Sequence, residues 1–360
     1  MDQSHRLGRS PALTCLSIWL FVAIAYSAAA ASDPLWPWSI GDQIKQVDER
    51  YDGELGVYIR DLDSGASYSY RAEETWYLAS TVKIPVAVTV LQAIDDGRLA
   101  LGSKVTLQPQ DFVDGAGQTN WHSPGDQVEI AYLLEQMVVY SDNTATDVLI
   151  RTVGVDAVNE LVKKHVLEGV GEITTLADVR RHAYSAFHEN AFNLKSGDLF
   201  TIKKSGNGDA RVNALAKVLG VSRNEFAVQT LDEAFAIYYH TGLNSGRLSA
   251  YSRFLEKLVN GDLLEKESQA YLLNTMERIK TGDNRIVAGL PPDVSFAHKT
   301  GTQYRRACNI GIATHGDGAS SQRVIIAVCA RGTRNLTDTE RAMRQVGEAI
   351  TRSGIFSESG

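Results

Sequence analysis

Hydrophobic positions follow two different periods along this chain, and the two periods occupy different regions. A period of two, typical of strands, occurs near both chain ends. It covers residues 55–60, 67–71 and 294–302, and residues 309–314 and 323–330 also have the composition of strands. Helical spacing dominates residues 80–289, and further helices are predicted over 40–51 and 338–352. This order predicts an α/β (α+β) fold: an antiparallel sheet of about five strands built from both chain ends, flanked by helices, with an inserted, mainly helical region.

The last two strands are predicted to form a hairpin around the polar turn at residues 315–321. Cys308 and Cys329 lie at the far ends of the two strands, so the hairpin can bring them opposite one another. A shift of one residue in the register would instead place them on opposite faces of the sheet. The sequence therefore leaves open whether they form a disulfide.

The first 30 residues have the pattern of a secretory signal peptide. Arg6 and Arg9 precede a largely apolar stretch over residues 13–26, and alanines at 28–31 offer small residues for cleavage. The apolar stretch is shorter than the ~20 residues of a spanning helix, which argues against a membrane anchor. The protein is therefore expected to be periplasmic or secreted, without membrane contact after cleavage.

The rest of the chain has the composition of a globular protein, and residues 31–360 are expected to form one domain. Of the 360 residues, 44% are hydrophobic and 22% are charged. Its α/β part is placed at about 35–75 and 290–360 and its helical part at about 76–289, with an enlarged insertion at about 178–228. Within the insertion, helical spacing of apolar residues indicates a packed helix. These residues are Val212, Leu215, Ala216 and Leu219.

Charge and histidine content exclude several classes of function. Lys and Arg number 36 against 43 Asp and Glu, for a net charge of −7, and there is no basic run to bind nucleic acid. The eight histidines form no spaced ligand set, so no metal and no cofactor is expected. No G-x-S-x-G motif occurs, and His188-Glu189 lacks the second histidine of a zinc protease motif.

Candidate chemistry begins with Ser80 and Lys83, the only S-x-x-K in the chain. Residues three apart share a helix face, so Lys83 can take the proton of Ser80 while the helix N-terminus favours an oxyanion nearby. Alone, Ser80 is equally explained as a helix N-cap. Pro85 conflicts with a regular second turn, so either the helix starts irregularly or Ser80 precedes it in a loop.

Two further motifs follow along the chain. Tyr140-Ser141-Asp142-Asn143 lies between two predicted helices, where Ser141 can relay a proton and Asn143 can hold a substrate amide, although a plain helix N-cap explains it as well. Lys-Thr-Gly occurs twice. The copy at Lys280 has the features of a helix end, whereas the copy at Lys299 ends a strand, where it can seat a carboxylate.

Ser-x-x-Lys, Ser-Asp-Asn and Lys-Thr-Gly in this order are the signature set of penicillin-binding proteins and class A β-lactamases. Residues 79–143 and 281–332 resemble class A β-lactamases and their relatives, including Tyr140-Ser-Asp-Asn-Thr-Ala and Ala288-Gly-Leu-Pro before Lys299. The resemblance implies a β-lactamase/transpeptidase-like fold for residues 31–360. It also implies a serine hydrolase of small β-lactams or D-Ala-D-Ala peptides.

The catalytic roles implied by this resemblance fall on three residues. Ser80 would be the nucleophile that forms the acyl-enzyme, and Lys83 its activating base or proton partner. Ser141 would relay a proton to the leaving nitrogen. Lysine suits such a role only if burial or a nearby cation such as Lys299 lowers its pKa.

Substrate binding is implied for five residues, Asn143, Lys299, Thr300, Gly301 and Thr302. Asn143 would contact the substrate amide and Lys83, while Lys299 and Thr300 would bind the substrate carboxylate. Gly301 would let the strand approach closely. The backbone N–H groups of Ser80 and Thr302 would form the oxyanion hole.

The sequence departs from the class A pattern where deacylation is concerned. No E-x-x-L-N motif, whose glutamate holds the hydrolytic water, occurs between Ser141 and Lys299. The nearest string begins at Glu189 and has Phe192 in place of leucine, so Glu189 is the candidate base, against a plain helix entry. Asp147 stands where class A enzymes carry an asparagine that supports the glutamate.

A second departure concerns the arginine that often assists the substrate carboxylate, because Cys308 stands near its position. Arg305 and Arg306 are candidate substitutes, unless they are solvent-facing charges of a hairpin. The sequence therefore predicts a secreted, monomeric serine β-lactamase. A D-Ala-D-Ala carboxypeptidase or a slowly acylating penicillin-binding relative stays open as an alternative.

Overall fold

The computed structural model describes residues 34–166, 168–318 and 321–356. The predicted signal peptide lies outside these residues, which belong to one compact unit that starts at Pro34. Helix α1, Trp36–Arg50, begins four residues before the predicted start because Pro37 fits its first turn. Among the described residues, no helix is both long and apolar enough to cross a membrane.

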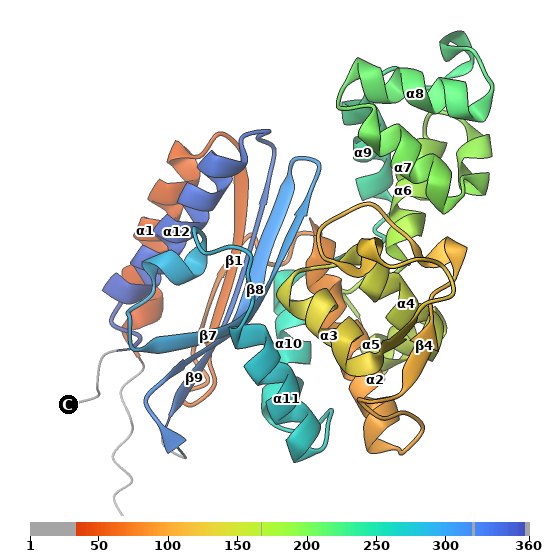
Figure 1. The fold of residues 1–360 in the computed structure, drawn as a ribbon. Helices are drawn as coiled ribbons and strands as arrows, with labels where there is room; N and C mark the ends of the chain where they lie inside the picture. The colour runs from red at the N-terminus through yellow and green to blue at the C-terminus, as the bar shows by residue number, and fades with distance from the viewer. Residues whose placement is uncertain (1–33, 167, 319–320, 357–360) are drawn as a thin grey trace, which may run out of the picture. The chain divides into compact units, whose positions relative to one another are not determined.

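Both chain ends build one antiparallel sheet, as predicted. Its strands lie in the order β2-β1-β9-β8-β7. Their bounds are β1 Glu54–Asp61, β2 Ser67–Tyr70, β7 Val294–Gln303, β8 Arg306–His315 and β9 Gln322–Arg331. In Figure 1 this sheet separates two layers, α1 with the C-terminal helix α12 (Leu336–Arg352) on one face and the helical region on the other.

Each face of the sheet buries its own core. Side chains of α1 and α12, such as Ile44 and Val346, pack with Val57 and Ile326 of the sheet. The opposite face packs against the larger core of the helical region. Alternation along β9 sends successive side chains to the two cores, which explains why residues 324–330 are apolar without interruption.

The register of β8 and β9 shows whether Cys308 and Cys329 can form a disulfide. Cys308 lies directly opposite Cys329, and the two are joined by a disulfide. The bridge links the central strands of the sheet.

The helical region is built around α2, Lys83–Asp95, which is buried on nearly every side. The surrounding helices are α3 Ile130–Val139, α4 Asn143–Val153, α5 Val155–Val166, α10 Leu248–Val259 and α11 Lys266–Glu277. Two small antiparallel pairs brace it, β3 Trp76–Tyr77 with β6 Ser245–Gly246, and β4 Lys104–Thr106 with β5 Gln127–Glu129.

The segment that the sequence analysis marks as an insertion consists of packed helices. They are α6 Leu176–Ser185, α7 Ser196–Lys204 and α8 Asp209–Leu219, followed by α9 Leu231–His240. Val212 and Leu215 of α8 are buried, and Phe187 packs on Phe226 with ring centroids 5.2 Å apart. Short 3-10 turns complete the chain: η1 Ala79–Val82, η2 Pro109–Asp111, η3 Thr119–Trp121, η4 Glu189–Asn193, η5 Arg223–Glu225 and η6 Ile286–Gly289.

Candidate active site

Ser80 lies in the 3-10 turn η1, immediately before α2. Helix α2 starts only at Lys83, so Pro85 falls in its first turn, where the lack of an N–H is tolerated. Ala79, just before Ser80, has a φ of 49°, a left-handed conformation that costs energy for a residue with a side chain. The chain therefore starts irregularly here, one of the two possibilities that Pro85 raised.

Lys83 is fully buried and points at the second motif. Its Nζ lies 2.6 Å from the Ser141 backbone oxygen, 3.3 Å from Ser141 Oγ and 2.9 Å from Asn143 Oδ1. Burial lowers the pKa of Lys83 to about 7, although the Asp142 and Asp147 carboxylates oppose the shift. Near neutral pH, a large fraction of Lys83 is thus an uncharged amine able to accept a proton.

The second motif forms the link between α3 and α4. Ser141 has a φ of 61°, a left-handed conformation that is uncommon outside glycine. Asp142 is the N-cap of α4, its carboxylate accepting from the Ala145 amide at 2.9 Å. The N-cap interpretation thus holds for Asp142, while Ser141 and Asn143 face Lys83.

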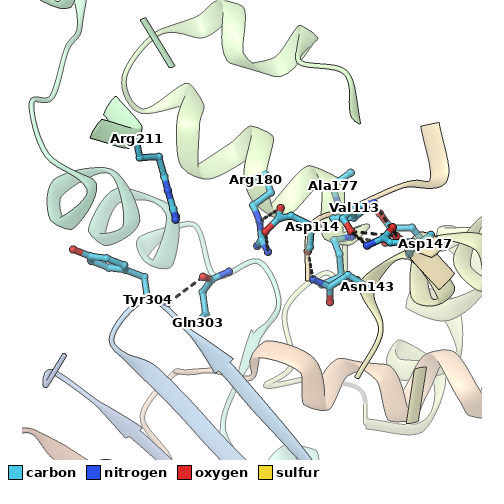
Figure 2. Close-up of polar contacts among 12 residues, drawn as sticks. Val113, Asp114, Asn143, Asp147, Ala177, Arg180, Arg211, Gln303 and Tyr304 are labelled. Atoms are coloured by element: carbon cyan, nitrogen blue, oxygen red, sulfur yellow. Dashed lines mark hydrogen bonds and ion pairs between the residues drawn. The ribbon is translucent and has the colours of Figure 1, made fainter. Parts of the chain in front are cut away.

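A buried ion pair supports Asn143 from behind. Asn143 Nδ2 donates to the Asp114 backbone oxygen at 2.7 Å, and the Asp114 carboxylate pairs with Arg180 of α6 at 2.9 Å (Figure 2). Burial opposes both charges, but their mutual attraction outweighs it, so the pKa of Asp114 falls and that of Arg180 rises. Both groups therefore stay charged within the site.

Asp147 fastens the start of α6 to α4. Its carboxylate accepts from the Leu176 amide at 2.6 Å and the Ala177 amide at 2.9 Å (Figure 2). Burial raises the pKa of Asp147 to about 7 in spite of these hydrogen bonds.

The third motif runs along β7, at the edge of the sheet, and approaches η1 very closely. A Cβ at Gly301 would lie 2.7 Å from the Leu78 oxygen and 2.8 Å from the Ser80 amide nitrogen. Only glycine allows this approach, which brings the strand against Ser80. Lys299 is fully buried, and burial lowers its pKa well below the usual value, assisted by Lys83 and Arg285.

The two Lys-Thr-Gly copies differ as the sequence analysis expected, yet they touch. Lys280 is exposed, three residues beyond the end of α11. Thr281 of that copy lies beside Thr300, with their hydroxyl oxygens 2.5 Å apart. The first copy thus helps to fix Thr300.

Arg285 is a further site residue, which the sequence did not predict. Its guanidinium is almost completely buried, donates to Thr302 Oγ1 at 2.7 Å and to the Cys308 backbone oxygen at 3.0 Å, and pairs with Glu340 of α12. It therefore places a guanidinium against Thr302 and the backbone of Cys308. Arg285 precedes a 3-10 turn without any periodic pattern, so the sequence offered no signal for it.

Three other candidate residues lie apart from these contacts. Glu189 begins η4 and is exposed, with no side-chain hydrogen bond within the described part of the chain. Arg305 and Arg306 lie at the β7–β8 turn, where Arg305 pairs with Asp232 of α9 at 2.9 Å. In the described ranges, no group of three or more metal-binding side chains occurs.

The comparisons with known proteins show the family and the fold of the chain. The family described as the β-lactamase enzyme family matches residues 39–193 and 203–353. The chain belongs to that family. The β-lactamase SME-1 of Serratia marcescens is 24% identical over 80% of this chain and 76% of its own length. A β-lactamase of Mycobacterium tuberculosis is 23% identical over 87% of this chain and 84% of its own length.

Solved structures extend the likeness of this β-lactamase family member to the fold. The structure of PBP-A has a TM-score of 0.65 and 23% identity, covering 87% of this chain and 95% of PBP-A. A mutant of PBP-A, described as an acyl-enzyme complex with penicillin G, has a TM-score of 0.65 and 22% identity, covering 88% of this chain and 95% of its own. The family thus includes serine β-lactamase-like hydrolases, and this chain has their fold.

Proposed function

We propose that the protein is an exported serine hydrolase that forms an acyl-enzyme at Ser80 and hydrolyses the amide bond of β-lactams. The observation that carries the proposal is Lys83, a buried amine with a pKa of about 7 that contacts Ser141 and Asn143 one helical turn from Ser80. An amine that is neutral near pH 7 is matched to the task of a general base. Burial without a counter-ion achieves this match.

In the proposed reaction, Lys83 takes the proton of Ser80 Oγ as that oxygen attacks the lactam carbonyl. The backbone N–H groups of Ser80 and Thr302 stabilise the resulting oxyanion. The C–N bond then breaks, and Ser141 passes its proton to the leaving nitrogen while it takes from Lys83 the proton that came from Ser80. Water finally releases the acyl group from Ser80.

The substrate carboxylate is proposed to bind at Lys299 and Thr300. Arg285, through its hydrogen bond to Thr302 Oγ1, holds that part of β7 in place and adds positive potential. Asn143, fixed by Asp114 and Lys83, is available to the amide of the acyl side chain.

The test of this proposal is incubation of the exported form with benzylpenicillin, followed by peptide mass spectrometry. We expect an adduct on Ser80 when the reaction is stopped early, and none in Ser80→Ala. An adduct on another residue, or a wild-type protein that neither forms an adduct nor hydrolyses the antibiotic, would refute the assignment.

A D-Ala-D-Ala peptidase is the second candidate function, and the surroundings of Glu189 favour it. Glu189 is exposed and makes no side-chain hydrogen bond among the described residues, whereas a deacylation base must hold a water beside the acyl group. A peptidase can do without fast release of a penicilloyl group. The lifetime of the benzylpenicillin adduct separates the two functions, since seconds or less supports a β-lactamase and hours supports the peptidase.

Glu189→Gln tests the candidate base directly, because glutamine keeps the size and removes the basic oxygen. If Glu189 is the base, the acyl-enzyme accumulates while the rate of Ser80 acylation stays near that of the wild type. Glu172→Gln, a surface change, serves as the matched control. Turnover by Glu189→Gln at the wild-type rate would transfer the role to another group, with Lys83 and Asp147 next.

A further inference from the structure

A cavity of about 540 Å³ opens at the end of β7, next to the candidate active site. One wall is the β7–β8 turn from Thr302 to Ala307, and others come from residues 207–212 of the insertion, from the start of α9, and from residues 330–339 between β9 and α12. The volume suits a small-molecule substituent. Thr302, whose backbone N–H belongs to the proposed oxyanion hole, lies in this wall, so the cavity borders the proposed reacting centre at that residue.

The charges that line the cavity are mostly arginine. Arg305 and Arg334 share one partner, the Asp232 carboxylate. Asp209, the other acidic residue of the lining, pairs with Arg223 on the outside. The lining therefore carries an excess of positive charge.

Arg306 is the arginine of this lining that has no carboxylate partner within 4.0 Å among the described residues. Its guanidinium lies 4.5 Å from the ring centroid of Tyr239, and one of its nitrogens donates to the Arg305 backbone oxygen at 2.9 Å. The Tyr239 hydroxyl donates to the Tyr304 backbone oxygen at 2.7 Å, which holds the ring against the turn. The guanidinium is thus half-buried and held in one orientation, and it can donate hydrogen bonds to an anion.

The position of Arg306 defines which end of a substrate can reach it. Arg306 pairs across the sheet with Gln303, the residue after Thr302. From strand rise and strand spacing, its Cα lies about 6 Å from that of Thr302. A substrate held by Lys299 at its carboxylate and by Thr302 at its carbonyl would direct the retained acyl side chain toward the cavity. An acyl substituent as long as about two extended residues, about 7 Å, spans the interval.

From this geometry we infer that the cavity is a subsite for a carboxylate on the acyl side of the substrate, bound by Arg306. The preferred substrates are acyl donors whose retained side chain ends in an anion several bonds from the reacting carbonyl. This inference rests on the proposed function, because it names the substrate class of the same site. The insertion contributes residues 207–212 to the lining of the subsite, which gives that segment a role in specificity.

The test uses a matched pair of penicillins, one with an adipoyl side chain and one with its methyl ester. They differ in one charge at the end of the side chain. We expect the wild type to be acylated by the adipoyl compound about 10-fold faster than by the ester, in second-order rate. Arg306→Gln should abolish that preference, while Arg344→Gln, on the exposed face of α12, should keep it.

In a second variant, Asp232→Asn, we expect the preference for the adipoyl compound over its ester to increase. Loss of the Asp232 charge releases Arg305 and Arg334, so the preference for the adipoyl compound should exceed that of the wild type. Equal rates for the two compounds with the wild type, or a preference that survives Arg306→Gln in a folded protein, would overturn the inference.

Binding to Ser80→Ala, measured by calorimetry, separates this inference from the proposed function. Tighter binding of the adipoyl compound than of its ester, lost on Arg306→Gln, supports the subsite even if Ser80 is never acylated. Conversely, Ser80 adducts with benzylpenicillin together with equal binding of the two adipoyl compounds would leave the proposed function intact and refute the subsite.

Discussion

Two buried lysines, Lys83 and Lys299, dominate the chemistry of the site. Both are fully buried, and within the described residues neither lies within 4.0 Å of a carboxylate. A positive charge on Lys83 disfavours a positive charge on Lys299, and this repulsion contributes to the lowered pKa of Lys299. A substrate carboxylate would supply the missing counter-ion. Burial of the two lysines costs folding free energy. It also suits Lys83 to the proposed role of base and Lys299 to the proposed binding of a carboxylate.

The first prediction concerns Lys299. Lys299→Ala should lower the second-order rate of Ser80 acylation by benzylpenicillin roughly 10- to 150-fold, the equivalent of losing a charge-assisted hydrogen bond of about 1.5–3 kcal/mol. Lys280→Ala is the matched control, because Lys280 is exposed and should leave the rate almost unchanged. Equal effects of the two substitutions would mean that the wrong Lys-Thr-Gly copy was assigned.

The pH dependence of acylation follows from Lys83. Its neutral form accepts the proton, and its pKa is about 7, so the acylation rate should rise from pH 5 to 8 with a midpoint near 7. The Asp147 carboxylate favours the charged form of Lys83, so Asp147→Asn should lower the Lys83 pKa and move the midpoint to lower pH. Stopped-flow rates with benzylpenicillin across this range measure both. A midpoint that moves upward in Asp147→Asn would contradict the role of Lys83 as base.

At the scale of elements, the decisive contact is that of β7 with η1. The Gly301→Ala side chain would press on the Leu78 oxygen and on the Ser80 amide, both part of the backbone. We expect a loss of about 1–3 kcal/mol in stability and a fall in acylation of around 100-fold, because η1 must shift. Thermal unfolding and acylation rates measure the two effects.

Gly197→Ala is the control for that substitution. Gly197 lies in α7, and a Cβ there would meet nothing within 4 Å. It should keep both the stability and the rate of the wild type. A Gly301→Ala variant that behaves like Gly197→Ala would show that β7 does not hold Ser80 in place.

The elements also show how far the sequence could predict the structure. The five strands and the closing helix follow from periodicity, and the motif order placed Ser80, Lys83 and Asn143 on elements that meet. The cysteine pairing stayed open because periodicity cannot define register to one residue, and only the paired strands do. Arg285 was missed for a related reason, since its partners Cys308 and Glu340 come from distant segments.

On the scale of the whole molecule, the insertion is coupled to the site through two carboxylates. Asp147 of α4 holds the start of α6, and Asp114 pairs with Arg180 one turn further along α6. The Asp114 backbone oxygen also accepts from Asn143, which contacts Lys83. The segment that contributes residues 207–212 to the Arg306 cavity is therefore fastened, through α6, to the helices that flank the second motif.

Arg180→Ala tests that coupling. The substitution leaves the Asp114 carboxylate buried without its cation, and breaking a buried pair from one side costs about 3–5 kcal/mol. Because Asn143 donates to the Asp114 backbone oxygen, acylation of Ser80 should slow as well. Arg98→Ala breaks an exposed pair with Asp96 and should cost less than about 1 kcal/mol. Denaturant unfolding and the rate of Ser80 acylation are measured on both variants. An Arg180→Ala protein that matches Arg98→Ala in stability and in acylation rate would mean that α6 does not support the site.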